Sequence, residues 1–443
     1  MEDKPSTRSG FLSRLPFDSS ILQNAPVRRF YLAMLIVAIG FGLTLSLFVV
    51  YFAEVRHFPE IVAGALLSWQ AVLTLLTTPL MGTLIDRHGP SRMLVVALPA
   101  SAAAYALFAF TATIPEAIAV VCLIAPAQTA MWSSFNVLLA RIVHEDVRQE
   151  AFGLSFMILN LGIAMGSLVG PSFVDIHHLR TFQFVYVGNG LFMLLGAAIF
   201  ATLWSHGQSV ASAVDNGSTV HAGWREVIQD RKLLRFLVCA ALLLICGYGS
   251  IEAGIPLYVT QVLHHPVRTV GILFFFNTMT IIIAQIFVLG KIQGKSRSLL
   301  LGAVGLFWGA SWFCATASVL FSAVGATAAL CAGQIVFALG ETIWSPVGPA
   351  LVNDLATEEL RGRYNSVSTL VFGLGGMVGP IIATLFIQAH LGVLWSITVG
   401  AGAIAGGAFA TTLRKSLTAK QDGLDGKDGK FLKELLPPPQ VLD

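Results

Sequence analysis

The feature that most constrains this chain is a series of twelve long apolar runs, separated by short polar or Gly/Pro segments. A helix that crosses the ~30 Å hydrocarbon core of a bilayer needs about 20 mostly apolar residues. Only 12% of the 443 residues are charged, about half the usual quarter of soluble domains, which excludes a soluble enzyme, a secreted disulfide scaffold and a disordered chain. The runs predict twelve transmembrane helices, near residues 31–53, 61–83, 93–113, 117–138, 151–172, 183–204, 236–260, 269–289, 299–319, 323–352, 366–388 and 392–413.

The placement of lysine and arginine predicts the orientation of these helices, because cytoplasmic loops are enriched in basic residues. With the N-terminus in the cytoplasm, 24 of the 27 basic residues fall on the cytoplasmic side. Both termini are therefore expected in the cytoplasm, and the protein in the cell (inner or plasma) membrane. The expected organisation is a cytoplasmic tail (1–30), a six-helix bundle (31–204), a cytoplasmic linker (205–235), a second six-helix bundle (236–413) and a second cytoplasmic tail (414–443).

The two six-helix halves share landmarks in the same order, 207 to 213 residues apart. The matched segments are Gly40-Phe41-Gly42 with Gly247-Tyr248-Gly249, Tyr51 with Tyr258, His57 with His264, Trp132-Ser133 with Trp344-Ser345, Arg148 with Arg361, and Gly170-Pro171 with Gly379-Pro380. The sequence therefore predicts an all-α membrane fold of two pseudo-symmetric bundles, an arrangement that allows alternating access by rocking one half against the other.

Several chemistries lack their sequence signature. The five cysteines lie in apolar stretches without a CxxC spacing, so we interpret them as buried hydrophobes. No GxxxxGK[ST] segment, no His/Cys/Asp cluster with metal-ligand spacing and no nucleophile–base–acid set occurs. We therefore expect no metal, no cofactor, no enzymatic activity and no nucleic-acid partner. The expected partners are a small-molecule substrate, protons and the lipid bilayer, and the expected assembly is a monomer.

The loop after the second span carries the most specific motif, Gly82-Thr83-Leu84-Ile85-Asp86-Arg87-His88-Gly89-Pro90-Ser91-Arg92. It resembles the G-x-L-x-D-R-x-G signature of the major facilitator superfamily, although Pro90-Ser91 replaces the usual basic pair. The resemblance extends over the whole chain and implies a secondary transporter in which Gly82, Asp86, Arg87, Gly89 and Arg92 form a conformational latch.

The physical basis of this latch would be the Asp86 carboxylate. It can accept N–H groups from the N-terminus of a neighbouring helix, or pair with Arg141 or Arg148, which would favour the outward-open state. The alternative is a solvated turn whose arginines only set the topology. The matching loop of the second half, 290–295, lacks the acid, so any latch there is expected to be weaker.

Two of the 24 acidic residues, Glu252 and Glu341, lie deep in apolar sequence. At 1.5 Å per residue, Glu252 lies ~12 Å from the outer end of its helix and Glu341 ~16 Å from the inner end of its own. Both are therefore near mid-membrane depth. No lysine or arginine lies within a predicted span, so burial favours the neutral form of each carboxyl. Since intramembrane ionisable groups mark functional sites by default, both are candidate proton-coupling residues. The alternative is a permanently protonated glutamate that hydrogen-bonds between helices.

The surroundings of Glu341 extend the resemblance. Gly340-Glu341, Ser345-Pro346, Asp354 and the segment Arg361-Gly362-Arg363-Tyr364-Asn365 look like span ten of proton-coupled multidrug exporters of the superfamily. Many of those antiporters also have an acid in span one and an arginine in span four, and the spans predicted here have neither. Any coupling would then depend on Glu252 and Glu341.

The resemblance also implies that spans one, four, seven and ten line a central cavity. The candidates that share a helix face are Gln128, Trp132 and Asn136 in span four, Tyr248 in span seven, and Gln334 and Trp344 in span ten. An aromatic cavity with acids and few other polar groups suits apolar or cationic ligands. Small residues allow close helix packing, and the candidate helix-packing residues are Gly162, Gly166, Gly170, Pro171, Gly379 and Pro380.

These observations favour proton-coupled export of hydrophobic or cationic small molecules. A symporter or uniporter for a small metabolite is the alternative within transport, but such a protein should have more polar groups in its spans. A transport-inactive receptor or scaffold is the alternative from another class, but it would need a larger soluble domain than the linker provides.

Overall fold

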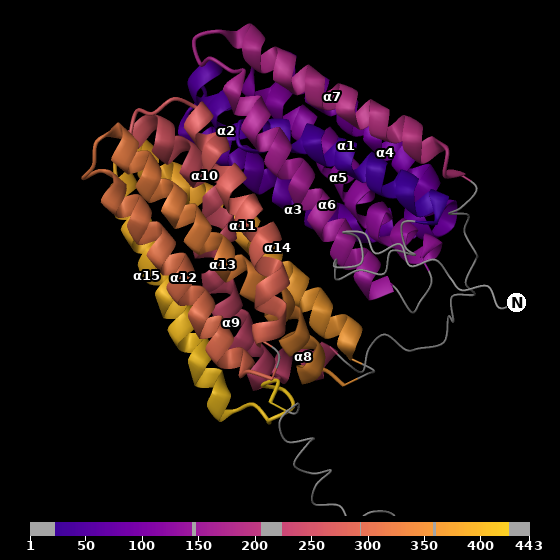
Figure 1. The fold of residues 1–443 in the computed structure, drawn as a ribbon, viewed down its shortest axis with the longest axis vertical. Helices are drawn as coiled ribbons and strands as arrows, with labels where there is room; N and C mark the ends of the chain where they lie inside the picture. Colours follow the sequence, from indigo (N-terminus) through magenta and orange to yellow (C-terminus); the bar gives the residue numbers. More distant parts are fainter. Residues whose placement is uncertain (1–22, 144–147, 205–223, 293, 358–359, 425–443) are drawn as a thin grey trace, which may run out of the picture.

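The computed structural model describes residues 23–143, 148–204, 224–292, 294–357 and 360–424 (Figure 1). Within these ranges every regular element is a helix, and twelve helices are long and apolar enough to cross a membrane. The fold is therefore the predicted all-α membrane fold. The residues left out include most of the predicted linker and much of both predicted tails.

The first half of the chain forms one bundle. Its membrane helices are α1 (Ala25–Leu45), α3 (Glu60–His88), α4 (Pro90–Phe110), α5 (Ile114–Ile142), α6 (Arg148–Val169) and α7 (Leu179–Ala201), with short turns α2 (Phe48–Val50), η3 (Tyr51–Val55) and η5 (Gly170–Ser172). Their ends follow local chemistry. Proline stands in the first turn of α4 and α5, where its missing N–H costs no hydrogen bond because first-turn N–H groups have no partner within the helix. Thr113 and Glu116 form a capping box on α5.

The second half forms the other bundle. It contains α8 (Trp224–Gln229), α9 (Arg231–Cys246), α10 (Tyr248–Leu257), η7 (Tyr258–Val262), α11 (Arg268–Ile292), α12 (Arg297–Ser318), α13 (Ala323–Leu355), α14 (Arg361–Gln388), α15 (Gly392–Thr412) and η8 (Leu413–Lys415). Asp230 caps α9 by accepting the N–H groups of Lys232 (2.8 Å) and Leu233 (3.3 Å). The helix begins within the segment that the sequence assigned to the linker.

The first and seventh spans differ most from the prediction of single continuous helices. The first begins at Ala25, six residues earlier than expected, and is interrupted at Ser46–Leu47 between α1 and α2. The seventh is divided by Gly247 into α9 and α10. Apolar composition predicts that a segment crosses the membrane, but it does not show where the backbone hydrogen bonds within that segment are broken.

The outer ends of these two spans reveal the internal repeat in atomic detail. Both end in a π-helical turn, η3 and η7, and the next histidines, His57 and His264, both have φ of 55°. The Tyr51 hydroxyl donates to the Ala109 carbonyl at 2.9 Å, and the Tyr258 hydroxyl donates to the Ala315 carbonyl at 2.9 Å. Equivalent residues thus make equivalent contacts in the two halves.

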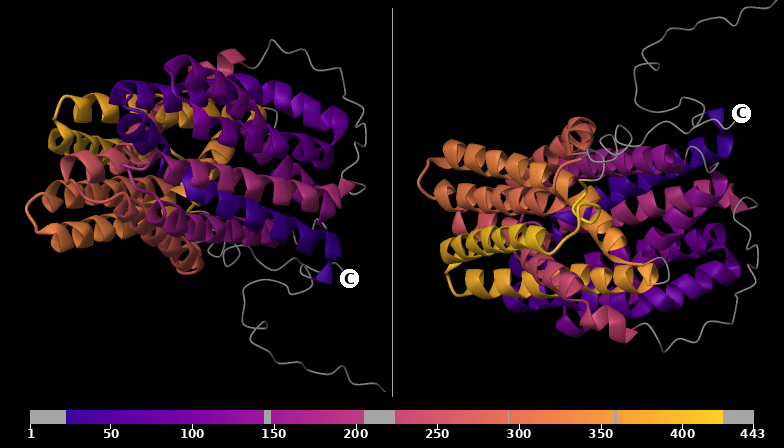
Figure 2. Two further views of the ribbon diagram at one scale, coloured as in Figure 1. Left: turned by 90° about the horizontal axis from the view of Figure 1, so that it is seen from above. Right: turned by 90° about the horizontal axis from the view of Figure 1, so that it is seen from below.

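The two bundles lie side by side, the second half mainly to the left and the first mainly to the right in both views of Figure 2. They meet where α3 packs on α14 and α6 packs on α11. We call the face that carries the α3–α4 turn at Gly89 the inner face, and the face that carries η3 and η7 the outer face. In Figure 1 the bundles approach each other near α2 and α10, on the outer side, and diverge toward the inner side.

The helix-packing candidates lie where helices approach most closely. Gly162 and Gly166 of α6 and Gly170 of η5 face α1, and a Cβ on Gly166 would overlap the carbonyl oxygen of Ile39. In the second half, Gly379 of α14 lies against Gly249 of α10. Contacts between backbones at this range leave no room for a side chain.

Candidate functional site

Glu341 lies on α13, and its side chain is only 8% exposed. The Asn277 amide of α11 donates to its Oε2 at 2.8 Å, and the Tyr248 hydroxyl of α10 lies close to the carboxyl group. Both neighbours are neutral. Among the described residues the carboxyl has a hydrogen-bond donor but no ion-pair partner, so a proton or a cationic ligand can supply the positive charge.

The break in the seventh span determines where Tyr248 lies. Gly247 adopts φ −96° and ψ −98°, so α9 ends and α10 starts in a new direction. Two carbonyls released by the break have other partners: the Ser250 hydroxyl donates to Ile245 at 2.9 Å, and the Trp312 indole donates to Cys246 at 2.7 Å. Broken helices inside a membrane persist only where such donors replace the lost hydrogen bonds.

A cavity of about 290 Å³ lies next to this site, between α9, α10, α13 and α14. Its aromatic lining consists of Phe236, Tyr248, Trp344 and Phe372, and no lysine, arginine, aspartate or glutamate lines it. Tyr248 lines the cavity and also lies close to Glu341, so a ligand that contacts this ring also contacts a neighbour of the carboxyl. The sequence prediction placed Tyr248 and Trp344 at the substrate cavity, and both line this one.

Glu252 follows Tyr248 by one turn of α10 and is exposed. Ala253 and Leu257 of the same helix pack into the core of the first half. Glu252 lies on the helix face between these residues and Tyr248, so it faces the space between the two bundles. It makes no hydrogen bond with any residue in the described ranges.

The remaining cavity candidates take other positions. Gln334 lies two turns before Glu341 and is 3% exposed, and its Oε1 has no partner among the described residues. In the first half, Gln128 accepts a hydrogen bond from Gln70 (2.9 Å) and donates one to Tyr105 (2.7 Å). Trp132 packs edge-to-face on Phe41, and Asn136 is exposed. None of these three first-half residues lines the cavity beside Tyr248.

Within the described ranges, no group of three or more His, Cys, Asp or Glu side chains could hold a metal ion, and the five cysteines are free thiols. The central site therefore consists of carboxyl, amide, phenol and aromatic groups. Such a site can bind a ligand and exchange a proton.

Comparison with known proteins identifies the family. A model described as "Major Facilitator Superfamily" matches residues 30–333. The chain belongs to this superfamily. Its members in these comparisons are transporters, and this chain is a transporter by family and not an enzyme.

Two superfamily relatives have names that concern cation or drug transport. A "Na(+), Li(+), K(+)/H(+) antiporter" of Planococcus maritimus is 23% identical over 408 residues, covering 83% of this chain and 91% of the relative. "Multidrug resistance protein MdtH" of Photorhabdus laumondii subsp. laumondii is 22% identical over 352 residues, covering 78% of this chain and 82% of the relative.

Two solved transporter structures have the same fold. A variant of the nucleoside transporter NupG aligns with a TM-score of 0.74 at 12% identity, covering 88% of this chain and 99% of that one. A variant of the peptide transporter POT aligns with a TM-score of 0.72 at 16% identity, covering 90% and 95%. At such identities the likeness concerns the fold alone.

The superfamily signature loop connects α3 and α4 on the inner face. Gly89 has φ of 86°, a backbone conformation suited to glycine, and it joins the two helices directly. Asp86 is exposed and has no hydrogen-bond or ion-pair partner among the described residues, and the Arg148 side chain lies outside them. Arg92 lies over the ring of Trp204, 5.4 Å from its centre. The latch stays a prediction for the state in which the inner side closes.

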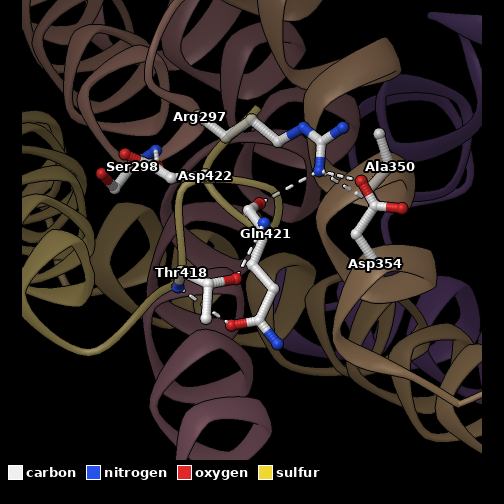
Figure 3. Close-up of polar contacts among 7 residues, drawn as sticks. All are labelled: Arg297, Ser298, Ala350, Asp354, Thr418, Gln421 and Asp422. Atoms are coloured by element: carbon white, nitrogen blue, oxygen red, sulfur yellow. Dashed lines mark hydrogen bonds and ion pairs between the residues drawn. The ribbon is translucent and has the colours of Figure 1, made fainter. Parts of the chain in front are cut away.

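The second half has inner-face contacts that the sequence did not predict (Figure 3). Arg297, at the start of α12, forms an ion pair with Asp354 near the end of α13 and donates to the Gln421 carbonyl at 3.0 Å. Asp422 is 2% exposed and accepts hydrogen bonds from the Ser296 hydroxyl and from the Ser298 N–H at 2.8 Å. The loop itself lacks an acid, but Asp354 of α13 and Asp422 of the C-terminal segment contact the start of α12 on this face.

Sequence reasoning also missed Glu54 and the role of Asn277. Glu54 follows the predicted end of the first span by one residue, and η3 places it at the interface of the two halves. A signal for Glu54 was present, because its repeat equivalent, Gln261, is also polar beside an apolar run.

Proposed function

We propose that this chain is a proton-coupled secondary transporter that exports hydrophobic or cationic small molecules by alternating access. The observation that carries the proposal is the buried Glu341 carboxyl, joined through Tyr248 to an aromatic cavity that has no basic residue in its lining. A cation in that cavity gains from the faces of Trp344 and Tyr248 and from the negative charge nearby.

Competition for Glu341 supplies the coupling. Either a proton or a cationic ligand neutralises the carboxylate, so binding of one disfavours binding of the other. A cycle that loads substrate from the inner side and protons from the outer side exchanges the two across the membrane. Glu252, exposed between the halves, is a second position where a proton or a ligand cation can bind.

The divergence of the bundles on the inner side supports an inward-facing starting state for this cycle. Substrate enters from the face that the basic loops assign to the cytoplasm. The names of the two antiporter and multidrug relatives support the same direction of transport. The competing function is symport of a metabolite, because the solved structures with the same fold are named as nucleoside and peptide transporters.

The test is transport by the purified protein in proteoliposomes under an imposed pH gradient. Tetraphenylphosphonium serves as the lipophilic cation, and ⁸⁶Rb⁺, a nucleoside and a dipeptide serve as competing substrates. We expect uphill movement of tetraphenylphosphonium, reduced more than tenfold in Glu341→Gln. Glu226→Gln removes one exposed carboxyl and is the matched control.

Each outcome has a distinct meaning. Loss of flux in Glu341→Gln but not in Glu226→Gln supports coupling through Glu341. Equal flux in the wild type and Glu341→Gln contradicts that role. If the nucleoside or the dipeptide moves together with protons and tetraphenylphosphonium does not move, the function is metabolite symport and not drug export. Movement of ⁸⁶Rb⁺ alone restricts the substrate to inorganic cations.

A further inference from the structure

Glu54 is a carboxyl group at the interface of the two halves that the central site does not use. It lies on η3, at the outer end of the first span. Its Oε1 is buried and has no hydrogen-bond partner among the described residues. The groups that act on it across the interface are Thr260 and His264 of the second half.

The hydrogen bonds around Thr260 favour a neutral Glu54. The Thr260 hydroxyl donates its single hydrogen to the Pro256 carbonyl at 3.1 Å, which leaves the Thr260 oxygen as an acceptor. A protonated Glu54 has a hydrogen to donate to that oxygen, whereas an ionised Glu54 has none. A buried carboxylate oxygen without a donor is costly, so closure of this interface favours the protonated form.

Glu54 belongs to a set of side chains that close the outer side. Gln261 of the second half donates to Glu60 of the first at 3.3 Å, and the Ile61 N–H donates to Gln388 at 3.1 Å. We call Glu54, Glu60, Thr260, Gln261 and Gln388 the outer gate. Cavities of about 630 and 660 Å³ border the gate and share Thr260 and His264 in their lining.

We propose that Glu54 is a proton-binding residue of the outer gate, and that its neutral form stabilises the contact between the two halves on the outer side. The inference rests on the alternating access of the proposed function, but it requires no particular substrate. Protonation from outside would then close the outer side, which is the step an antiporter needs after it has released its substrate.

The direction of the pH dependence follows from linkage. Burial in the closed gate and the nearby Glu60 charge favour the neutral form of Glu54, whereas the nearby His264 favours the charged form. In the open gate the carboxyl meets water, which favours the charged form. Protonation therefore stabilises the closed gate at low pH, and this stabilisation is lost as pH rises. The other charged or titratable groups nearby fall into two sets. Arg56 and His57 lie on the same segment as Glu54, and the cavity of about 660 Å³ is also lined by Asp175, His177, His265 and Arg268.

The experiment measures the opening of the outer side directly. Spin labels are placed at Phe173→Cys and Leu320→Cys, two exposed outer-face positions (72% and 80%) on opposite halves, in the full chain with its five native cysteines replaced. Distances between the labels are recorded by double electron–electron resonance in lipid nanodiscs from pH 5 to pH 8. With native Glu54 we expect the short-distance population to fall at least threefold over this range.

Two variants separate Glu54 from its neighbours. Glu54→Gln mimics the protonated group, and we expect the short distance at every pH. Glu60→Gln keeps an oxygen that accepts from Gln261 but removes a neighbouring negative charge, so we expect the distance to stay pH-dependent, with its transition at lower pH. A pH-dependent distance in Glu54→Gln, a flat response with native Glu54, or loss of the response only in Glu60→Gln would each overturn the proposal. This experiment measures distances and no substrate flux. A failed drug-export assay would therefore not change what the distances say about Glu54.

Discussion

At the scale of single residues, the central site combines groups from three helices around one carboxyl. Glu341 comes from α13, Asn277 from α11 and Tyr248 from α10. The two neighbours of this carboxyl differ in what they add. Asn277 donates a hydrogen bond to the carboxyl, whereas Tyr248 lies beside it and lines the cavity, so replacing each should have separable effects.

Replacing Asn277 should change the pH dependence of transport more than substrate affinity. Without its donor, the ionised form of Glu341 loses a charge-assisted hydrogen bond of about 1.5–3 kcal/mol. The carboxyl then releases its proton only at higher pH. For Asn277→Leu we expect the pH of half-maximal transport to rise by about one unit, measured in proteoliposomes.

The control for this variant lies on the same helix. Thr280 is one turn from Asn277, is half-buried and donates to the Phe276 carbonyl of its own helix. Thr280→Val should keep the native pH profile. A profile that stays unchanged in Asn277→Leu, or that shifts equally in Thr280→Val, contradicts a role for the Asn277 hydrogen bond.

Sequence reasoning found the carboxyl but not its surroundings. Glu341 and Glu252 stand out because acids are rare in apolar runs, and Tyr248 follows from its spacing on a helix. The Asn277 contact joins residues 64 positions apart, and no local pattern encodes such a pairing. Glu54 was missed because the predicted end of the first span fell one residue before it.

At the scale of elements, the seventh span shows how a broken helix is supported. Gly247 ends α9, and Gly249 lets α10 approach α14 so closely that a Cβ would overlap the Gly375 carbonyl. The repeat predicted glycines at these positions, but not the break. The equivalent glycines of the first span, Gly40 and Gly42, lie within helix α1, and that span is interrupted later, at Ser46–Leu47, so a break at these glycines occurs only in the second half.

A methyl group at Gly249 should separate α10 from α14. We expect Gly249→Ala to lower the apparent Tm, because overpacking at a close contact costs about 1–3 kcal/mol. Gly188→Ala is the matched control, since a Cβ there meets no atom within 4 Å, and alanine favours helix. Tryptophan fluorescence during heating in detergent gives both values. Equal Tm values for the two variants would contradict the importance of this approach.

At the scale of the whole molecule, the inner face of the second half is held together by the C-terminal segment. Arg297 and Asp422 join the start of α12, the end of α13 and residues 418–422, and the Lys232 ammonium of α9 donates to Gln421 at 3.0 Å. Three membrane helices are thereby linked at their inner ends. Rocking of two halves requires each half to move as a unit, and these contacts make the second half such a unit.

Residues 418–422 should detach from the inner face more often when Asp422 no longer accepts its hydrogen bonds. Hydrogen bonds to a charged group contribute about 1.5–3 kcal/mol, so we expect Asp422→Ala to raise the rate of proteolysis within residues 416–424 about tenfold or more. Lys420→Ala, on the same segment and exposed, is the control. Mass spectrometry of timed digests in nanodiscs gives both rates, and matching rates in the two variants would contradict the anchoring role.

The fold was predictable at this scale because twelve apolar runs, alternating basic loops and a repeat of about 207 residues all restrict the same architecture. The inner-face contacts were not predictable, since they join Arg297 to a segment more than a hundred residues later. The apolar pattern that defines the spans also carries no information about which side of the molecule is closed.

Glu252 and Glu341 are carboxyls near mid-membrane depth, and no lysine or arginine lies within a predicted span. The number of these carboxyls that carry a proton decides whether transport depends on the membrane voltage. If Glu252 and Glu341 each carry a proton inward while one monovalent cation leaves, every cycle moves one net positive charge, and a potential of 100 mV contributes about 2.3 kcal/mol to it. If Glu341 alone takes part, the exchange is electrically silent. The current across a membrane that contains the protein therefore reports how many carboxyls turn over in each cycle.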